Sequence, residues 1–238
     1  MPTEIISGLW IGDVNDISAY YQYELVFRNL KYSFKTLQHK AVENIKYMDE
    51  LTNEAKSSQS INTIYKIENK LVGHNTDIAG FELALRHIKY NINNKKVLIL
   101  GSGGVVPSII LALKKMKASK IILSNRTKKN ADRLNNFFKE LKIIEWGEIP
   151  EFDVIINATS IGLNKDDEIN LNYKDLGSNK LFYDLIYNPK ETNFLKKAKA
   201  FGNTTENGKM MFIYQAHQSF TIWHKVMPEI DDEVLNLI

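Results

Sequence analysis

The sequence predicts an α/β protein in which a doubly wound parallel sheet follows a smaller, shortened α/β region. Two observations carry this prediction. An apolar run at residues 97–100 meets a glycine cluster, a helical pattern follows, and a second apolar run occupies residues 121–123. Apolar runs and helical patterns then alternate as far as residue 200, which is typical of a parallel sheet covered by helices on both faces.

The first region, residues 1–85, is expected to be a small domain of mixed elements. Its candidate strands are residues 9–11, 32–37 and 61–67, and its candidate helices are residues 17–30, 41–56 and 75–89. A polar stretch, Asn-Asn-Lys-Lys at residues 93–96, follows the last of these helices before the glycine unit.

The second region, residues 86–207, is expected to form the larger sheet domain. After the glycine unit it shows a helical pattern at 131–141, strand patterns at 154–156 and 181–186, and a helical pattern at 191–200. Two further helical patterns, 208–225 and 231–238, end the chain. We expect these C-terminal helices to pack back on the first region.

The turn after the first buried strand carries Gly101, Ser102, Gly103 and Gly104. Glycines let the backbone approach a pyrophosphate, and the positive end of the following helix attracts it. Val106 stands where the usual third glycine would fall. The turn is therefore predicted to bind a dinucleotide, and the alternative is a tight strand-to-helix turn without a ligand.

The second buried strand ends at Asn125, Arg126, Thr127 and Lys128. A carboxylate here would bond the free 2′-hydroxyl of NAD, whereas a basic cluster suits the extra 2′-phosphate of NADP. The sequence therefore predicts NADP as the cofactor and these four residues as contacts with it. The alternative interpretation of Arg126 is an ordinary solvated side chain.

The composition excludes several classes of protein. The 238 residues include no cysteine, which rules out a disulfide framework, a thiolate zinc site and a cysteine nucleophile. A net charge of +3, from 31 basic and 28 acidic residues, is too balanced to indicate nucleic-acid binding. The five histidines show no metal-binding spacing. Without a long apolar run or an N-terminal signal pattern, we expect a cytoplasmic protein with no membrane partner.

Several groups of residues occur in an order and spacing that resemble a known family. They are residues 61–64, 73–77, the glycine turn with Asn125-Arg126-Thr127, residues 157–160, 183–189, and 207–211 with Gln215-Ala216. Together they resemble the shikimate dehydrogenases, NADP enzymes that reduce 3-dehydroshikimate. The resemblance runs from about Asp49 to the C-terminus and implies two α/β domains around a cleft.

The resemblance also implies roles for particular residues. It assigns proton handling to Lys40 and Asp77, since reduction of a ketone needs a proton donor near the carbonyl oxygen. It assigns substrate contacts to Asp77, Ser18, Asn62, Tyr187 and Gln215, and further cofactor contacts to Asn157, Ala158, Thr159, Gly208 and Met211. Each of three residues also has an alternative structural interpretation. Asp77 would cap a helix, Asn62 would form a turn and Tyr187 would lie in the core.

The family pattern is altered in the first forty residues. The family's Ser-x-Ser-Pro motif holds the substrate carboxylate, and here Ser18 is followed by Tyr20 and Tyr21 at the second serine and the proline. Lys40 precedes Asp49 by one position more than is usual, and Ala41 occupies the strict lysine position. Either Lys40 is the catalytic lysine after a shortened lead-in, or the segment that carries it is deleted.

The function expected from the sequence is NADPH-dependent reduction of 3-dehydroshikimate to shikimate by a monomer or homodimer. One alternative is a non-catalytic nucleotide-binding or regulatory relative that kept only the cofactor domain. Another is a dehydrogenase that acts on quinate or a different cyclic hydroxy acid. The position of the Lys40 ammonium relative to the Asp77 carboxylate separates the first alternative from an enzyme.

Overall fold

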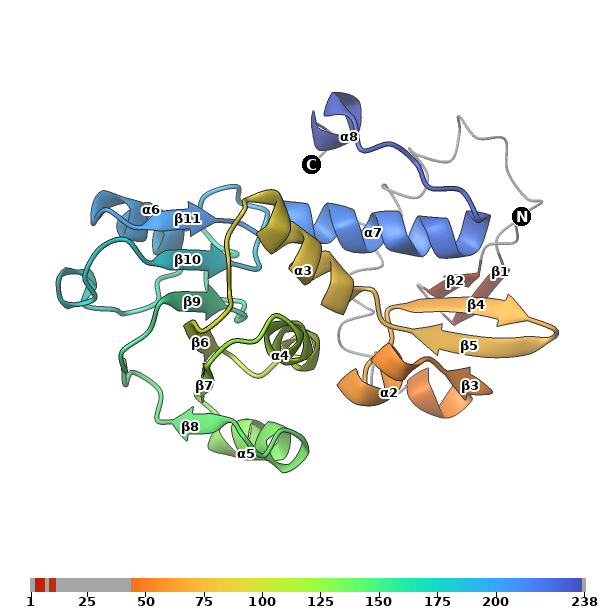
Figure 1. Cartoon of the computed structure of the whole chain (residues 1–238), viewed down its shortest axis with the longest axis horizontal. Helices are drawn as coiled ribbons and strands as arrows, with labels where there is room; N and C mark the ends of the chain where they lie inside the picture. Colours follow the sequence, from red (N-terminus) through yellow and green to blue (C-terminus); the bar gives the residue numbers. More distant parts are fainter. Residues whose placement is uncertain (1–2, 7–8, 12–43, 237–238) are drawn as a thin grey trace.

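The larger part of the molecule is built on a parallel sheet. The computed structural model describes residues 3–6, 9–11 and 44–236, and within them a six-stranded sheet has the order β11-β10-β9-β6-β7-β8 (Figure 1). Its strands are β6 (Lys96–Leu100), β7 (Lys120–Ser124), β8 (Lys142–Ile144), β9 (Val154–Asn157), β10 (Leu181–Asp184) and β11 (Thr204–Glu206). Every neighbouring pair is parallel. The doubly wound sheet predicted from the sequence is therefore confirmed.

Burial on both faces explains why these strands are continuous apolar runs. In β6, Val97 and Ile99 face one core cluster and Leu98 and Leu100 face the other, because successive side chains of a strand alternate. One cluster packs under α3 (Asp77–His87), α4 (Val106–Lys115), α5 (Lys128–Phe137), α7 (Lys209–His224) and α8 (Asp232–Asn236). The other lies under α6 (Asn193–Ala200) and the 3-10 helix η2 (Tyr173–Asp175).

A smaller sheet precedes the large one. It has the order β3-β5-β4, in which β3 (Glu50–Leu51) is parallel and β4 (Thr63–Ile67) antiparallel to β5 (Lys70–His74). Helix α2 (Asn53–Ser58) contributes Ala55 to a small core with Ile61 and Ile64. Upstream, β1 (Thr3–Ile6) and β2 (Leu9–Ile11) form an antiparallel pair.

Helices α3 and α7 lie side by side and join the two parts (Figure 1). They approach closely because Gly80 of α3 has no side chain: a Cβ there would lie 2.8 Å from Gln215 Cβ and 3.0 Å from Met211 O. At the far end of α7, Trp223 Nε1 donates to Ile64 O of β4 at 2.9 Å. Helix α7 therefore reaches from the large sheet to the small one. The expected domain boundaries stay a prediction.

Most predicted elements are present, and one is wrong. Residues 41–56 were expected to form one helix, but residues 44–56 contain the 3-10 helix η1 (Asn44–Tyr47), strand β3 and the start of α2. The carboxylate of Asp49 accepts from Leu71 N at 2.7 Å, and Asp49 N donates to Leu71 O at 3.0 Å, so pairing with β5 interrupts the helix. Thr52 then caps α2 by accepting from Ala55 N.

Five described strands have no counterpart among the predicted strands, namely β1, β3, β5, β8 and β11. Strand β5 pairs with β4 through a tight turn at Glu68 and Asn69, which have φ angles of 46° and 68°. Strands β8 and β11 are three-residue edge strands, too short to show a periodic pattern. The expected helix at 17–30 and strand at 32–37 lie outside the described residues.

Candidate active site

The centre of the site is an asparagine–aspartate pair between the small sheet and α3. Asp77 is the first residue of α3, and the residue as a whole is only 8% exposed. Asn75 Oδ1 accepts from Asp77 N at 3.0 Å and from Ile78 N at 3.3 Å. Because Asn75 satisfies these helix N–H groups, the Asp77 side chain is not used as a cap.

Asn62 is held in one orientation beside this carboxylate. Its Oδ1 accepts from Thr76 N at 2.9 Å, so its Nδ2 faces the other way and donates to Asp77 Oδ1 at 2.9 Å. Nδ2 also lies 2.9 Å from Thr76 Oγ1. Burial raises the pKa of Asp77 to about 6, although the Asn62 hydrogen bond acts in the opposite direction. The carboxylate is therefore ionised near neutral pH and protonated in mild acid.

The late helix α7 brings Gln215 to the same place. Gln215 is buried, its Nε2 donates to Phe212 O at 2.9 Å, and its Oε1 lies 3.5 Å from Thr76 Oγ1. Tyr187 is half-buried and stacks on Phe212, with ring centroids 4.7 Å apart. The structure thus gathers Asn62, Asp77 and Gln215 around Thr76, whereas Tyr187 packs against the start of α7.

The two site residues predicted in the first forty positions, Ser18 and Lys40, lie outside the described residues. Within residues 45–236, no lysine, arginine or histidine side chain forms an ion pair with Asp77. The partner of this carboxylate in proton handling therefore stays a prediction.

The glycine turn lies where the strand order of the large sheet reverses, between β6 and β9. Open α/β sheets bind ligands at this point. Gly101 has a φ of +106°, and a Cβ there would lie 2.7 Å from Ala158 O. Gly103 is exposed, and the nearest atom to a Cβ built there would be Ala158 O at 3.9 Å. Val106, at the third-glycine position, is fully buried in the core. The turn therefore has room for a ligand above Gly103.

The basic cluster after β7 is exposed to solvent, as a phosphate contact requires. Asn125 Nδ2 donates to Thr127 O at 2.8 Å and shapes the turn. Lys128 Nζ lies 3.0 Å from Glu145 Oε1, so part of its charge is already neutralised. Arg126 forms no ion pair within the described part of the chain and is the freer of the two cations.

A buried polar network joins the ends of β9 and β10. Asp184 is fully buried and accepts from Thr192 Oγ1 at 2.6 Å, Asn157 Nδ2 at 3.0 Å and Ile186 N at 3.0 Å. Burial raises its pKa to about 6, against the effect of these bonds. Asn157 Oδ1 in turn accepts from Thr159 Oγ1 at 2.7 Å. Asn157 therefore shapes the loop that carries Ala158 and Thr159.

Asp184 was part of the sequence pattern but was not among the predicted site residues. The signal that could have found it is an acidic residue at the end of a buried apolar strand, since a buried carboxylate needs several donors. Gly208, in contrast, is among the predicted cofactor contacts. A Cβ there would lie 2.1 Å from Leu185 O. This contact seats the start of α7, including the buried Met211, against the loop after β10.

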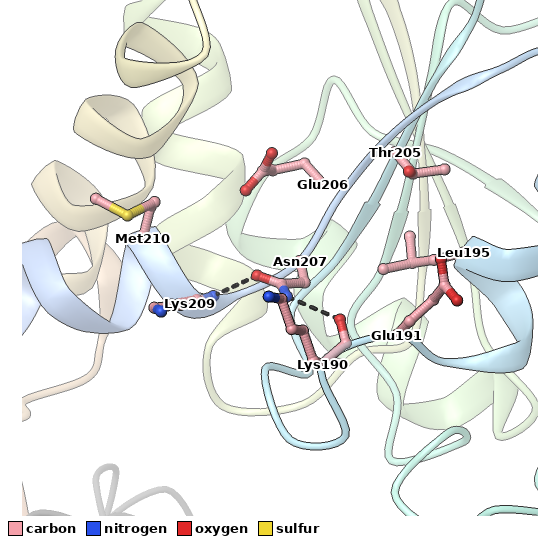
Figure 2. Close-up of a pocket in the computed structure, with 8 residues that line it drawn as sticks. All are labelled: Lys190, Glu191, Leu195, Thr205, Glu206, Asn207, Lys209 and Met210. Atoms are coloured by element: carbon pink, nitrogen blue, oxygen red, sulfur yellow. Dashed lines mark hydrogen bonds between the residues drawn. The ribbon is translucent and has the colours of Figure 1, made fainter. Parts of the chain in front are cut away.

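A separate cavity of about 510 Å³ lies at the outer edge of the large sheet (Figure 2). It is lined by Lys190, Glu191, Leu195, Thr205, Glu206, Asn207, Lys209 and Met210. Figure 2 shows Asn207 in its middle, donating to Lys190 O at 2.8 Å and accepting from Lys209 N at 3.1 Å. Its lining includes neither the Asn62–Asp77 pair nor the glycine turn, so it is distinct from the predicted site.

Two negative findings apply to the part of the chain that the structure describes. No three His, Asp or Glu side chains there are grouped so as to hold a metal ion. No helix there is long and apolar enough to cross a membrane.

The strand order and the glycine turn define a Rossmann-type α/β protein with a second, smaller sheet. A model of the shikimate / quinate 5-dehydrogenase family matches residues 82–189. The shikimate dehydrogenase (NADP(+)) of Pelagibacter ubique is 60% identical over 194 residues, which are 82% of this chain and 73% of that protein. The chain belongs to the shikimate dehydrogenase family.

Solved structures are similar over most of the chain. The shikimate 5-dehydrogenase of Thermus thermophilus, in complex with NADP(H) and shikimate, has a TM-score of 0.73 and 28% identity over 80% of this chain and 72% of that one. The 5-ketofructose reductase of a Gluconobacter strain has a TM-score of 0.76 and 27% identity over 94% of this chain and 86% of that one.

Proposed function

We propose that this chain reduces 3-dehydroshikimate to shikimate with NADPH. The observation that carries the proposal is the part-buried Asn62–Asp77 pair, held between the small sheet and α3 in a chain that belongs to the shikimate dehydrogenase family. A substrate with neighbouring hydroxyl groups suits this pair, because an amide donor and a carboxylate acceptor lie 2.9 Å apart.

The glycine turn and the basic cluster fit NADPH, which supplies the hydride when bound. Gly101 allows the turn after β6 to lie close against Ala158, and the open space at Gly103 leaves the backbone accessible to a pyrophosphate. Arg126, with Asn125, Thr127 and Lys128, would hold the 2′-phosphate. Thr159, Gly208 and Met211 would border the nicotinamide end.

On the substrate side, Asp77 would accept a hydrogen bond from a hydroxyl next to the reacting carbonyl. With a pKa of about 6, it is mostly ionised at neutral pH and is able to take and return a proton. Asn62 and Gln215 would orient the ring hydroxyls, and Ser18 the carboxylate. Lys40 would supply the proton that the ketone oxygen needs as it becomes a hydroxyl.

The test is NADPH consumption by the full chain with 3-dehydroshikimate. We expect turnover by the unmodified protein and its loss in Lys40→Ala, with NADPH binding retained in both. NADPH binding without turnover in the unmodified protein would contradict the proposal and support the non-catalytic alternative. Unchanged turnover in Lys40→Ala would remove only Lys40 from the catalytic pair.

A different substrate is the second candidate. The similarity to a 5-ketofructose reductase shows that closely related folds occur in reductases of other ketones. Comparing kcat/KM for 3-dehydroshikimate with kcat/KM for 3-dehydroquinate and 5-ketofructose decides between them. A higher value for either competitor would replace the proposed substrate while keeping NADPH and Asp77 in their roles.

The assembly and the location also stay proposals. The monomer or homodimer expected from the sequence is decided by light scattering of the purified chain, where a larger assembly would refute it. The cytoplasmic location is tested by fractionation of cells that express the protein, where recovery outside the cytoplasmic fraction would refute it.

A further inference from the structure

Three buried hydroxyl groups lie behind the Asn62 amide. Ser219 of α7 is 3% exposed, and its Oγ lies 2.7 Å from Thr63 Oγ1 and 3.2 Å from Thr76 Oγ1. Thr63 Oγ1 donates to Asn62 Oδ1 at 3.1 Å, and Thr76 N donates to the same oxygen at 2.9 Å. The amide that faces Asp77 is therefore held directly by Thr63 and Thr76, and Ser219 contacts the hydroxyl groups of both.

Each hydroxyl carries one proton, and this limits how the cluster is arranged. When Ser219 donates to Thr63, the Thr63 proton is directed to Asn62 Oδ1. When Ser219 donates to Gln215 O at 3.0 Å, it accepts the Thr63 proton instead. In both arrangements Ser219 bonds the Thr63 hydroxyl, but only the first lets Thr63 donate to Asn62 Oδ1. Loss of the Ser219 hydroxyl leaves Asn62 as the remaining side-chain partner of Thr63 Oγ1 among the described contacts.

The backbone around the cluster is rigid enough for this contact to matter. The close approach at Gly80 fixes α7 against α3, and the Trp223 bond to Ile64 O fixes it against β4. Met211, Gln215 and Ser219 recur every four residues and therefore lie on one face of α7. That face extends from the predicted nicotinamide end of the site to the Asn62–Asp77 pair.

From this geometry we infer that Ser219 is a positioning residue: it holds Asn62, through Thr63 and Thr76, so that the Asn62 amide donates to Asp77 beside the proposed substrate hydroxyl. The inference rests on the proposed function for the role of Asn62 toward substrate. It does not require Ser219 to contact either ligand.

The test compares Ser219→Ala with Thr221→Ala in the full chain. Both variants remove a hydroxyl of α7 that lies within hydrogen-bond distance of the carbonyl four residues earlier, but Thr221 Oγ1 bonds only His217 O among the described contacts. We expect Ser219→Ala to lower kcat/KM for 3-dehydroshikimate about threefold to tenfold, the range of one neutral hydrogen bond, and to leave KM for NADPH unchanged. We expect Thr221→Ala to change neither.

A spectroscopic measurement separates this inference from the proposed function. The side-chain amide signals of Asn62 in ¹⁵N NMR, assigned by their loss in Asn62→Ala, report its orientation whether or not the protein turns over substrate. We expect shifted signals and faster solvent exchange in Ser219→Ala, and unchanged signals in Thr221→Ala. Unchanged Asn62 signals in Ser219→Ala would overturn the inference. An inactive unmodified protein would contradict only the proposed function.

A second variant covers the case in which Ser219→Ala does not fold. Thr63→Val breaks the same hydroxyl contact from β4, and it should reproduce the shifted Asn62 signals. If both single variants fold, the double variant should lose no more kcat/KM than the more impaired of the two single variants, because the two hydroxyls act through one contact. Fully additive losses, or unchanged Asn62 signals in Thr63→Val, would overturn the inference.

Discussion

At the scale of single residues, the account depends on a carboxylate whose environment is unusual. Asp77 is buried and receives a hydrogen bond from Asn62, while the donor groups at the start of α3 are satisfied by Asn75. The resemblance assigned Asp77 and Asn62 to one substrate site, and the structure places their side chains 2.9 Å apart. It could not show that Asn75, two residues earlier, takes over the capping role, because Asn and Asp are both favoured at such positions.

The first expected outcome concerns catalysis by Asp77. Asp77→Asn keeps the shape and an acceptor for the Asn62 amide but cannot take up a proton, so turnover should fall about 10²-fold or more. Titration of NADPH fluorescence should show unchanged cofactor binding. In the unmodified protein, kcat/KM should decrease as pH falls through about 6, where Asp77 becomes protonated. Near-normal turnover in the variant would remove Asp77 from the catalytic pair.

The second expected outcome concerns stability. The pKa of Asp77 is about 6 in the folded state, above the ordinary 3.8. Between these values the folded chain holds a proton that the unfolded chain has released, so the free energy of unfolding decreases as pH rises. Asparagine does not titrate, so Asp77→Asn removes this decrease in the free energy of unfolding. Urea unfolding should therefore show the variant equal to the unmodified protein near pH 4 and about 1–3 kcal/mol more stable near pH 8. A variant that is less stable at pH 8 would contradict the assigned pKa.

At the scale of elements, the glycine turn and the end of β7 are the proposed contacts with the cofactor. The sequence predicted β6, the turn, α4 and β7, because an apolar run that meets glycines and then a helical pattern is a local signal. The cofactor contacts in these segments stay predictions. The sequence could not predict that Lys128 pairs with Glu145, since 17 residues separate them and only the pairing of β7 with β8 brings their segments together. The same limitation applies to residues 41–56, where pairing of Asp49 with Leu71 overrides helix propensity.

Arg126 should determine the choice between the two nicotinamide cofactors. Loss of one charge-assisted contact costs about 1.5–3 kcal/mol, so Arg126→Ala should weaken NADPH binding about tenfold or more and leave NADH binding nearly unchanged. Calorimetric titration with each cofactor measures the two effects separately. Lys129→Ala, a neighbouring exposed cation, is the matched control. Equal losses for NADPH and NADH would show that Arg126 does not contact the 2′-phosphate.

Gly101 should be far less replaceable than Gly103 in the same turn. An alanine at Gly101 combines a φ of +106° with a Cβ 2.7 Å from Ala158 O, whereas a Cβ at Gly103 has no such neighbour closer than 3.9 Å. We expect Gly101→Ala to lower the free energy of unfolding by about 2 kcal/mol or more. Gly103→Ala should lower it by less than about 1 kcal/mol. Similar losses in the two variants, measured without cofactor, would contradict the described turn.

At the scale of the whole molecule, α7 is the connection between the two sheets. It starts where Gly208 touches Leu185 beside β10 and ends where Trp223 bonds Ile64 of β4. Its sequence predicted a helix, but not the partners of Ser219, because contacts across more than 140 residues leave no local signal. The Asn62–Asp77 pair and the glycine turn thus belong to different parts of the chain, linked through α3 and α7.

The most direct test of the central claim follows the hydrogen atom itself. The full chain is incubated with 3-dehydroshikimate and NADPH deuterated on the transferred position, and the product is examined by mass spectrometry. The account predicts shikimate that carries one deuterium on the former carbonyl carbon, formed by the unmodified protein and about 10²-fold more slowly by Asp77→Asn. Bound NADPH that retains its deuterium, with 3-dehydroshikimate recovered unchanged, would contradict it.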